Sequence, residues 1–232
     1  MLTCLPRCCA NPHPYTYVQV QYVLSDKTGT LTQNVMGFVW ASVGGRLYGR
    51  APTADKAPPG VPSRTPHTIA LDSELRRALR GARSVPSPGV MAGSEGEAGP
   101  LHDFLLNLAV CNTVVPERLH DGTLVYQASS PDEEALVQGA AYLGYVLKSR
   151  TTDTVSVEVR GALMTFDIMV TLEFNSDRKR MSIIVRSPDG RLLLMTKGAD
   201  SIVLARIAAG EPGVDVVQDH LVRMWQCSVG LS

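Results

Sequence analysis

A succession of short apolar segments joined by short turns fills the second half of the sequence, and it restricts the fold more than any other feature. Several segments alternate apolar and polar residues, as half-buried strands do. They cover 124–127, 145–148, 154–159, 170–174, 181–186 and 191–196. Ser187-Pro188-Asp189-Gly190 between the last two is typical of a hairpin turn. Because the helical segments are grouped rather than alternating with the strands, we expect an α+β fold with a mostly antiparallel sheet.

Three helices are predicted around these strands. Residues 101–110 carry apolar side chains at helical spacing. The next helix has a well-marked start, with Ser130 as N-cap, Pro131 as its first residue and Glu133 in the third position of a capping box. A shorter helix is expected over 201–208, where a glycine follows closely.

The first half of the chain contains a compositional break. Before it, 35–42 and 46–48 read as two strands around the hairpin signal Gly44-Gly45. Pro, Gly, Ser and Ala then dominate 51–100, where only 69–79 has a helical pattern. We interpret this region as a long loop that holds one amphipathic helix and is inserted within a domain.

Composition excludes some classes of function. Lys plus Arg and Asp plus Glu number 22 each, so the formal net charge is +0 and there is no basic excess to indicate nucleic-acid binding. No run approaches the roughly 18 apolar residues of a membrane span.

The five cysteines are odd in number and form no C-x-x-C pair, which favours a reducing compartment. Cys4, Cys8, Cys9 and His13 match no common zinc spacing, so we interpret 1–17 as an irregular leader.

The segment with the clearest chemistry follows a predicted strand at 18–24. That strand runs into the polar turn Ser25-Asp26-Lys27-Thr28-Gly29-Thr30. A carboxylate in this position can attack a γ-phosphate and form an aspartyl-phosphate. Mg²⁺ prefers oxygen ligands, and the Asp26 carboxylate and the Thr28 carbonyl would offer them. Asp26 as a simple cap of a polar turn is the alternative interpretation.

Ser25-Asp26-Lys27-Thr28-Gly29-Thr30-Leu31-Thr32 resembles the phosphorylation signature of P-type ATPases. Related phosphatases place a second Asp two residues after the nucleophile, where it acts as general acid and base. Here that position is Thr28, which cannot do this. The resemblance therefore implies a longer-lived phosphoenzyme, as a pump requires.

Four strings in the second half extend the resemblance to the phospholipid flippases, and most of all to their class I animal branch. They occur in the order seen in that branch and are Ser130 to Leu136, Glu173 to Ser176, Arg178 to Ser182 and Lys197 to Asp200. The resemblance implies an ATP site made by Asp26, Lys27, Thr28, Glu133, Phe174 and Lys197. It also implies Mg²⁺ at Asp26 and Thr28, with ATP and Mg²⁺ as the cofactors.

Each residue of the second half has a simpler interpretation when taken alone. Glu133 is explained as a capping-box residue, Phe174 as part of a core and Lys197 as a solvated lysine. The functional interpretation makes Phe174 a face on which adenine stacks, with Lys197 near the ring. Asn112 replaces the His of the family's Cys-His-Thr string and receives no role.

The resemblance divides the chain into an irregular leader at 1–17, the first segment of a Rossmann-like phosphorylation domain at 18–34, and a nucleotide-binding domain at 35–232 with the insertion at 51–100. The family's membrane helices, actuator domain and the second half of its phosphorylation domain do not occur in this sequence. We therefore expect a truncated portion of a longer protein.

Two functions remain open at this point. In the first, the chain is the ATP-binding and phosphorylation portion of a membrane flippase, with its catalytic part on the cytosolic face. Such a flippase moves aminophospholipid or phosphatidylcholine-type lipids to the cytosolic leaflet, with an accessory subunit as a further partner. In the second, the chain is an inactive nucleotide-binding module or decoy, which would be cytosolic if made alone. No nucleic-acid partner is expected.

Overall fold

The computed structural model describes residues 36–49, 75, 77–79 and 98–229, all of which belong to one compact unit, Val35–Ser232. The predicted strand at 18–24 and the turn that contains Asp26 lie outside the described residues. The division into domains therefore stays a prediction.

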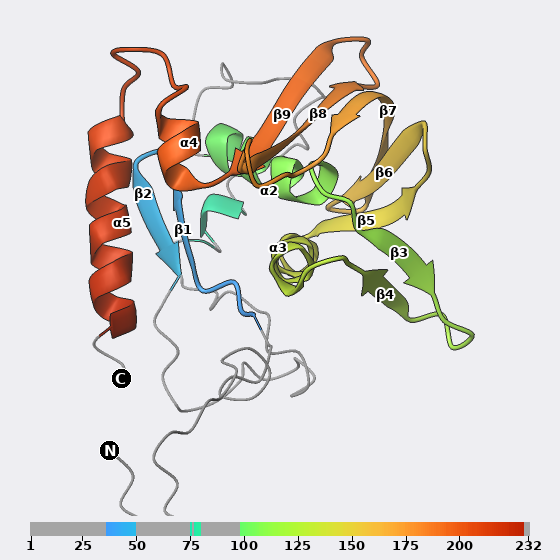
Figure 1. The fold of residues 1–232 in the computed structure, drawn as a ribbon. Coiled ribbons are helices and arrows are strands. Elements are labelled where there is room, and N and C mark those ends of the chain that lie inside the picture. Colours follow the sequence, from blue (N-terminus) through green and yellow to red (C-terminus); the bar gives the residue numbers. More distant parts are fainter. Residues whose placement is uncertain (1–35, 50–74, 76, 80–97, 230–232) are drawn as a thin grey trace, which may run out of the picture. The chain divides into compact units, whose positions relative to one another are not determined.

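A five-stranded antiparallel sheet is the largest sheet of the described unit (Figure 1). Its strands follow one another in sequence order, and each pairs antiparallel with the next. They are β5 (Tyr145–Arg150), β6 (Thr154–Val159), β7 (Ala162–Leu172), β8 (Arg180–Arg186) and β9 (Leu192–Gly198). The antiparallel α+β architecture predicted from the short turns is confirmed for this region.

Two hairpins accompany the sheet. The first joins β1 (Trp40–Val43) to β2 (Arg46–Gly49), and the second joins β3 (Val115–Arg118) to β4 (Leu124–Gln127). The strand predicted at 35–42 differs from the structure in its bounds, because β1 begins only at Trp40 and continues to Val43. β3 was not predicted, because three of its four residues are exposed and one is a proline.

β7 differs most from its predicted range. It begins at Ala162, directly after the turn residue Gly161, and ends before Phe174. Its pairing with β8 shifts register between Ile168 and Val170, a bulge that changes which side chains face the core. The predicted range 170–174 therefore missed most of the strand and placed Phe174 inside it.

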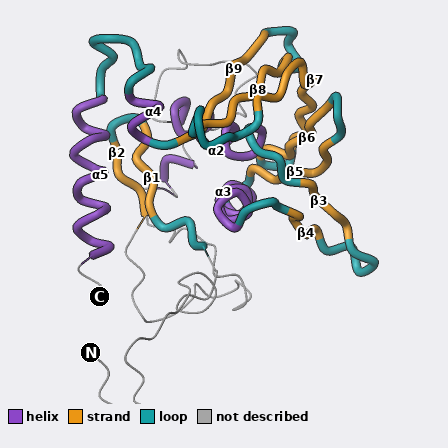
Figure 2. The backbone as a smooth tube through the Cα atoms, viewed as in Figure 1, coloured by secondary structure: helices purple, strands orange, loops and turns teal. Residues whose placement is uncertain are grey.

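Helices α2 (Ala98–Val110) and α3 (Pro131–Tyr142) pack against the same side of the sheet (Figure 2). Alternate strand residues that face them are fully buried, among them Leu147, Val157 and Ile183. Burial of such side chains contributes about 1.5–3 kcal/mol each, so this layer is the main source of stability.

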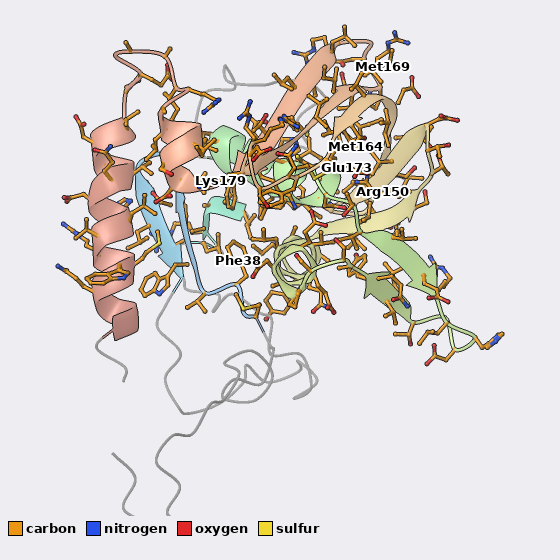
Figure 3. All side chains as sticks on the ribbon, in the orientation of Figure 1. Phe38, Arg150, Met164, Met169, Glu173 and Lys179 are labelled. Carbon is orange, nitrogen blue, oxygen red and sulfur yellow. The ribbon has the colours of Figure 1, made fainter. Side chains whose placement is uncertain are left out.

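The first hairpin shares this core. Phe38, just before β1, lies beside α3 (Figure 3), and its ring centroid is 6.4 Å from that of Phe104 in α2. Tyr48 of β2 and Leu75 are also buried in the same cluster. Leu75 belongs to the helix predicted over 69–79, of which the structure describes only a few residues.

Two helices complete the described chain. α4 (Asp200–Leu204) is shorter than the predicted helix at 201–208, and α5 (Val214–Val229) was not predicted. α5 contacts β1, where His220 Nδ1 lies 2.8 Å from the Ser42 hydroxyl. Among the helices of the described ranges, none has both the length and the hydropathy needed to span a bilayer.

Candidate functional site

A cleft of ≈ 640 Å³ opens between the start of α3, the end of β9 and the segment after β7. It brings together Glu133, Phe174 and Lys197, the three site residues predicted from the second half of the sequence. Its wall consists of Thr113, Ser129, Ser130, Asp132, Glu133, Leu136, Glu173, Phe174, Met181, Lys197, Gly198 and Ala199. Residues far apart in sequence therefore share one surface, as the resemblance implied.

Phe174 presents its ring to the cleft rather than to the core. Its side chain is 62% exposed, in a molecule whose other described phenylalanines are buried or half-buried. The turn that follows is held by its own bonds, because Asn175 Oδ1 accepts from the Arg178 backbone N–H at 2.7 Å and the Asn175 carbonyl accepts from Lys179 N–H at 2.8 Å. The simpler interpretation of Phe174 as a core residue is wrong.

Glu133 and Lys197, which both line the cleft, form an ion pair. Lys197 Nζ lies 2.6 Å from Glu133 Oε1, and the two side chains are only 20% and 15% exposed. Ser130 caps α3 by accepting from the Glu133 backbone N–H at 3.2 Å. The half of the capping box in which Ser130 accepts from the Glu133 N–H is confirmed. The Glu133 carboxylate accepts hydrogen bonds from Lys197 and Thr113.

The environment of Glu133 keeps it ionised. Burial alone would raise the pKa of its carboxyl, but hydrogen bonds from Lys197 and Thr113 lower the pKa below its ordinary value. The pair thus offers an acceptor and a cationic donor side by side at one wall of the cleft. Such a pair can recognise a base edge that carries both a donor and an acceptor.

Gly198 serves a purpose that the sequence did not reveal. A Cβ added there would lie 2.5 Å from Arg180 Cβ and 2.7 Å from the Lys179 carbonyl oxygen. The absence of a side chain at Gly198 therefore allows β9 to approach β8 closely. Because Lys197, Gly198 and Ala199 all line the cleft, this close approach fixes one of its walls.

Residues behind the cleft were missed by the sequence analysis. Asn112 is fully buried and binds the last turn of α2, with its Nδ2 donating to the carbonyls of Leu108 at 3.0 Å and Ala109 at 2.9 Å. A buried amide that follows a helix end is a recognisable signal for such a role.

Burial raises the pKa of the neighbouring Cys111 thiol to about 11, so this cysteine stays protonated at neutral pH.

The remaining predicted site residues, Asp26, Lys27 and Thr28, lie outside the described residues, as do Cys4, Cys8, Cys9 and His13. Within the part of the chain that the structure describes, no three His, Cys, Asp or Glu side chains gather in a way that could hold a metal ion. The Mg²⁺ site at Asp26 and Thr28 therefore stays a prediction.

Comparisons with known proteins agree with this geometry. A family profile described as P-type ATPase, cytoplasmic domain N, matches residues 100–209, which contain the whole wall of the cleft. The chain is 38% identical over 205 residues to the human probable phospholipid-transporting ATPase IM, with 88% of the chain and 17% of that protein covered.

Further relatives carry the same kind of name. The chain is 40% identical to phospholipid-transporting ATPase IC of Xenopus tropicalis, with 88% of the chain and 16% of the relative covered. It is also 40% identical to the yeast phospholipid-transporting ATPase DRS2, with 82% and 13% covered. The chain thus spans about a sixth or less of the length of these curated relatives. Residues 100–209 therefore match the cytoplasmic domain N of the P-type ATPases, and 82–88% of the chain is similar to phospholipid-transporting ATPases.

Proposed function

We propose that the cleft binds ATP, with the adenine ring stacked on Phe174 and its edge facing the Glu133–Lys197 pair. The observation that carries this proposal is the exposed Phe174 ring in a cleft that also holds a paired lysine and carboxylate. An aromatic face exposed to water is solvated unfavourably. Stacking of a planar base on it would contribute about 1–3 kcal/mol to the binding free energy.

In the longer protein, this cleft would supply ATP to Asp26. A carboxylate oxygen of Asp26 attacks the γ-phosphorus, an O–P bond forms, and the bond from the γ-phosphorus to its bridging oxygen breaks to release ADP. Lys27 and Thr28 would bind the phosphates. Mg²⁺, held by Asp26 and Thr28, would neutralise their charge. The family resemblance and the four ordered strings support these roles.

The whole protein would use this phosphoenzyme to move phospholipid. The names of the relatives support phospholipid transport as the coupled process. Movement of aminophospholipid or phosphatidylcholine-type lipids to the cytosolic leaflet, residence in a membrane with the cleft on the cytosolic side, and an accessory subunit belong to the same proposal.

A second function is favoured by the position of the cleft within the chain. Among the described residues, its wall lies between Thr113 and Ala199, so the proposed adenine contacts are made without Asp26. The 232-residue chain would then act as a nucleotide-binding module without phosphoryl transfer, or as a decoy.

ATP binding to the full chain, measured by calorimetry, tests what the two functions share. We expect Phe174→Ala to weaken ATP binding by roughly 5- to 150-fold, because the stacking surface is lost. Leu194→Ala is the matched control, since Leu194 is 65% exposed and does not line the cleft. Equal affinities in the wild-type chain and Phe174→Ala would contradict the proposed site.

Labelled ATP with Mg²⁺ separates the two functions. A hydroxylamine-sensitive label that disappears in Asp26→Asn supports the phosphorylation portion of a flippase. ATP binding that depends on Phe174 without any such label supports the module.

A further inference from the structure

Thr113 lies three residues after the end of α2 and contacts Glu133 at the start of α3. Its hydroxyl donates to Glu133 Oε2 at 2.6 Å, and its backbone N–H donates to the same oxygen at 3.3 Å. The other carboxylate oxygen, Oε1, accepts from Lys197 Nζ at 2.6 Å. The carboxylate is therefore held at both oxygens, by groups that come from different sides of the cleft.

The turn that presents Thr113 is itself fixed. Asn112 Oδ1 accepts from the Val114 backbone N–H at 3.1 Å and from Arg150 Nη2 at 3.2 Å. Arg150 Nη2 also donates to the Val110 carbonyl at 2.6 Å, so β5 and the end of α2 are tied together at this point. Because these bonds are buried or partly buried, the backbone at Thr113 has little freedom to move.

We propose that Thr113 is a positioning residue of the cleft, whose hydroxyl orients the Glu133 carboxylate and, through it, Lys197 against the edge of a bound base. The inference rests on the proposed ATP function and deepens it, because it concerns how one base is chosen over another. Adenine has an amino donor where guanine has a carbonyl acceptor, so a fixed carboxylate and ammonium distinguish the two. A carboxylate free to rotate would accept either base more equally.

The charged surroundings of Glu133 give a second readout that needs no nucleotide. If the Thr113 hydroxyl is removed, the ionised Glu133 carboxylate loses one hydrogen bond. The pKa of Glu133 should therefore rise. Lys197 and Arg150 attract the ionised form, while the Cys111 thiol stays protonated at neutral pH and carries no charge there. The acidic groups beside Glu133 on α3 and the cleft wall are Asp132, Glu134 and Glu173.

The test compares Thr113→Val with Thr113→Ser in the full chain. Valine keeps the shape of threonine and its backbone N–H but removes the hydroxyl, whereas serine keeps the hydroxyl. We expect Thr113→Val to weaken ATP binding about tenfold and GTP binding by less, because a hydrogen bond to a charged group is lost. Thr113→Ser should stay near the wild-type ATP affinity and ATP-to-GTP ratio.

Thr165→Val is the matched control. The Thr165 hydroxyl is 3.0 Å from that of Ser156, and Thr165 is an exposed strand residue outside the cleft wall. This variant should leave both nucleotide affinities unchanged. A purely structural role of Thr113 would lower the melting temperature of Thr113→Val without changing the ratio of ATP to GTP affinity, and that result would overturn the proposal.

Titration of the ¹³C-labelled Glu133 carboxyl separates failure of this inference from failure of the ATP function. If the wild-type chain binds no ATP, the ATP function fails. In that case a higher Glu133 midpoint in Thr113→Val than in Thr113→Ser still supports the positioning role. An unchanged midpoint in Thr113→Val overturns it.

Discussion

Single residues define the cleft, where Phe174 presents an exposed ring and the Glu133–Lys197 ion pair presents an acceptor beside a cationic donor. Glu133, Phe174 and Lys197 could be predicted because each lies in a short string that resembles a known family. Thr113 and Arg150 could not, because their roles come from contacts with residues distant in sequence, such as the bond from Arg150 to the Val110 carbonyl. Only a folded chain shows which oxygen of Glu133 each donor reaches.

Gly198 provides a prediction at this scale. Gly198→Ala should destabilise the chain by about 1–3 kcal/mol, because the new Cβ would overlap Arg180 and push β9 away from β8. It should also weaken ATP binding, since Lys197 and Ala199 beside it line the cleft. Chemical denaturation and calorimetry would measure the two effects.

Gly190→Ala is the control for this change. Gly190 has φ 88° and no atom within 4 Å of an added Cβ, so alanine strains the backbone there without a clash. Both variants should lose stability, but only Gly198→Ala should lose ATP affinity. A Gly198→Ala chain with wild-type stability would show that the close β8–β9 approach does not restrict this position.

At the scale of elements, the strands and helices with strong local signals were predicted best. α3 begins where Ser130, Pro131 and Glu133 indicated, and the hairpin of β8 and β9 was recognised from its turn. The start of β7 was missed, and a bulge between Ile168 and Val170 breaks its alternation. α4 was predicted too long, because only tertiary contacts decide where so short a helix ends.

The packing of α3 against the first hairpin gives an element-scale prediction. An alanine in a helix interior normally stabilises it by about 1 kcal/mol relative to glycine. At Gly139 the new Cβ would lie 2.4 Å from Phe38 Cδ1, so we expect Gly139→Ala to destabilise the chain instead, by about 1–3 kcal/mol. Denaturant unfolding of the purified chain measures the change.

Phe38→Leu completes a double-mutant cycle for this contact. The smaller side chain leaves room for the new methyl group, so the double variant should be more stable than the sum of the two single changes predicts. Strict additivity would mean that Phe38 and Gly139 do not restrict one another, contrary to the structure.

At the scale of the whole molecule, the described residues form one core that the first hairpin, α2, α3 and the sheet share. The cleft is lined, among the described residues, by residues from the range 113–199. The chain spans 13–17% of the relatives compared above, and nucleotide binding is a property for which this chain can be tested directly.

The central claim is that Phe174 stacks on the adenine ring of ATP, and ring-labelled phenylalanine makes it measurable. The chain has four phenylalanines, of which Phe38 and Phe166 are buried, Phe104 is half-buried and Phe174 is exposed in the cleft. In an aromatic ¹³C–¹H NMR titration with ATP, the account predicts a saturable shift of the Phe174 ring signals while the other three stay in place. Unmoved Phe174 signals at ATP concentrations that saturate the chain would contradict it.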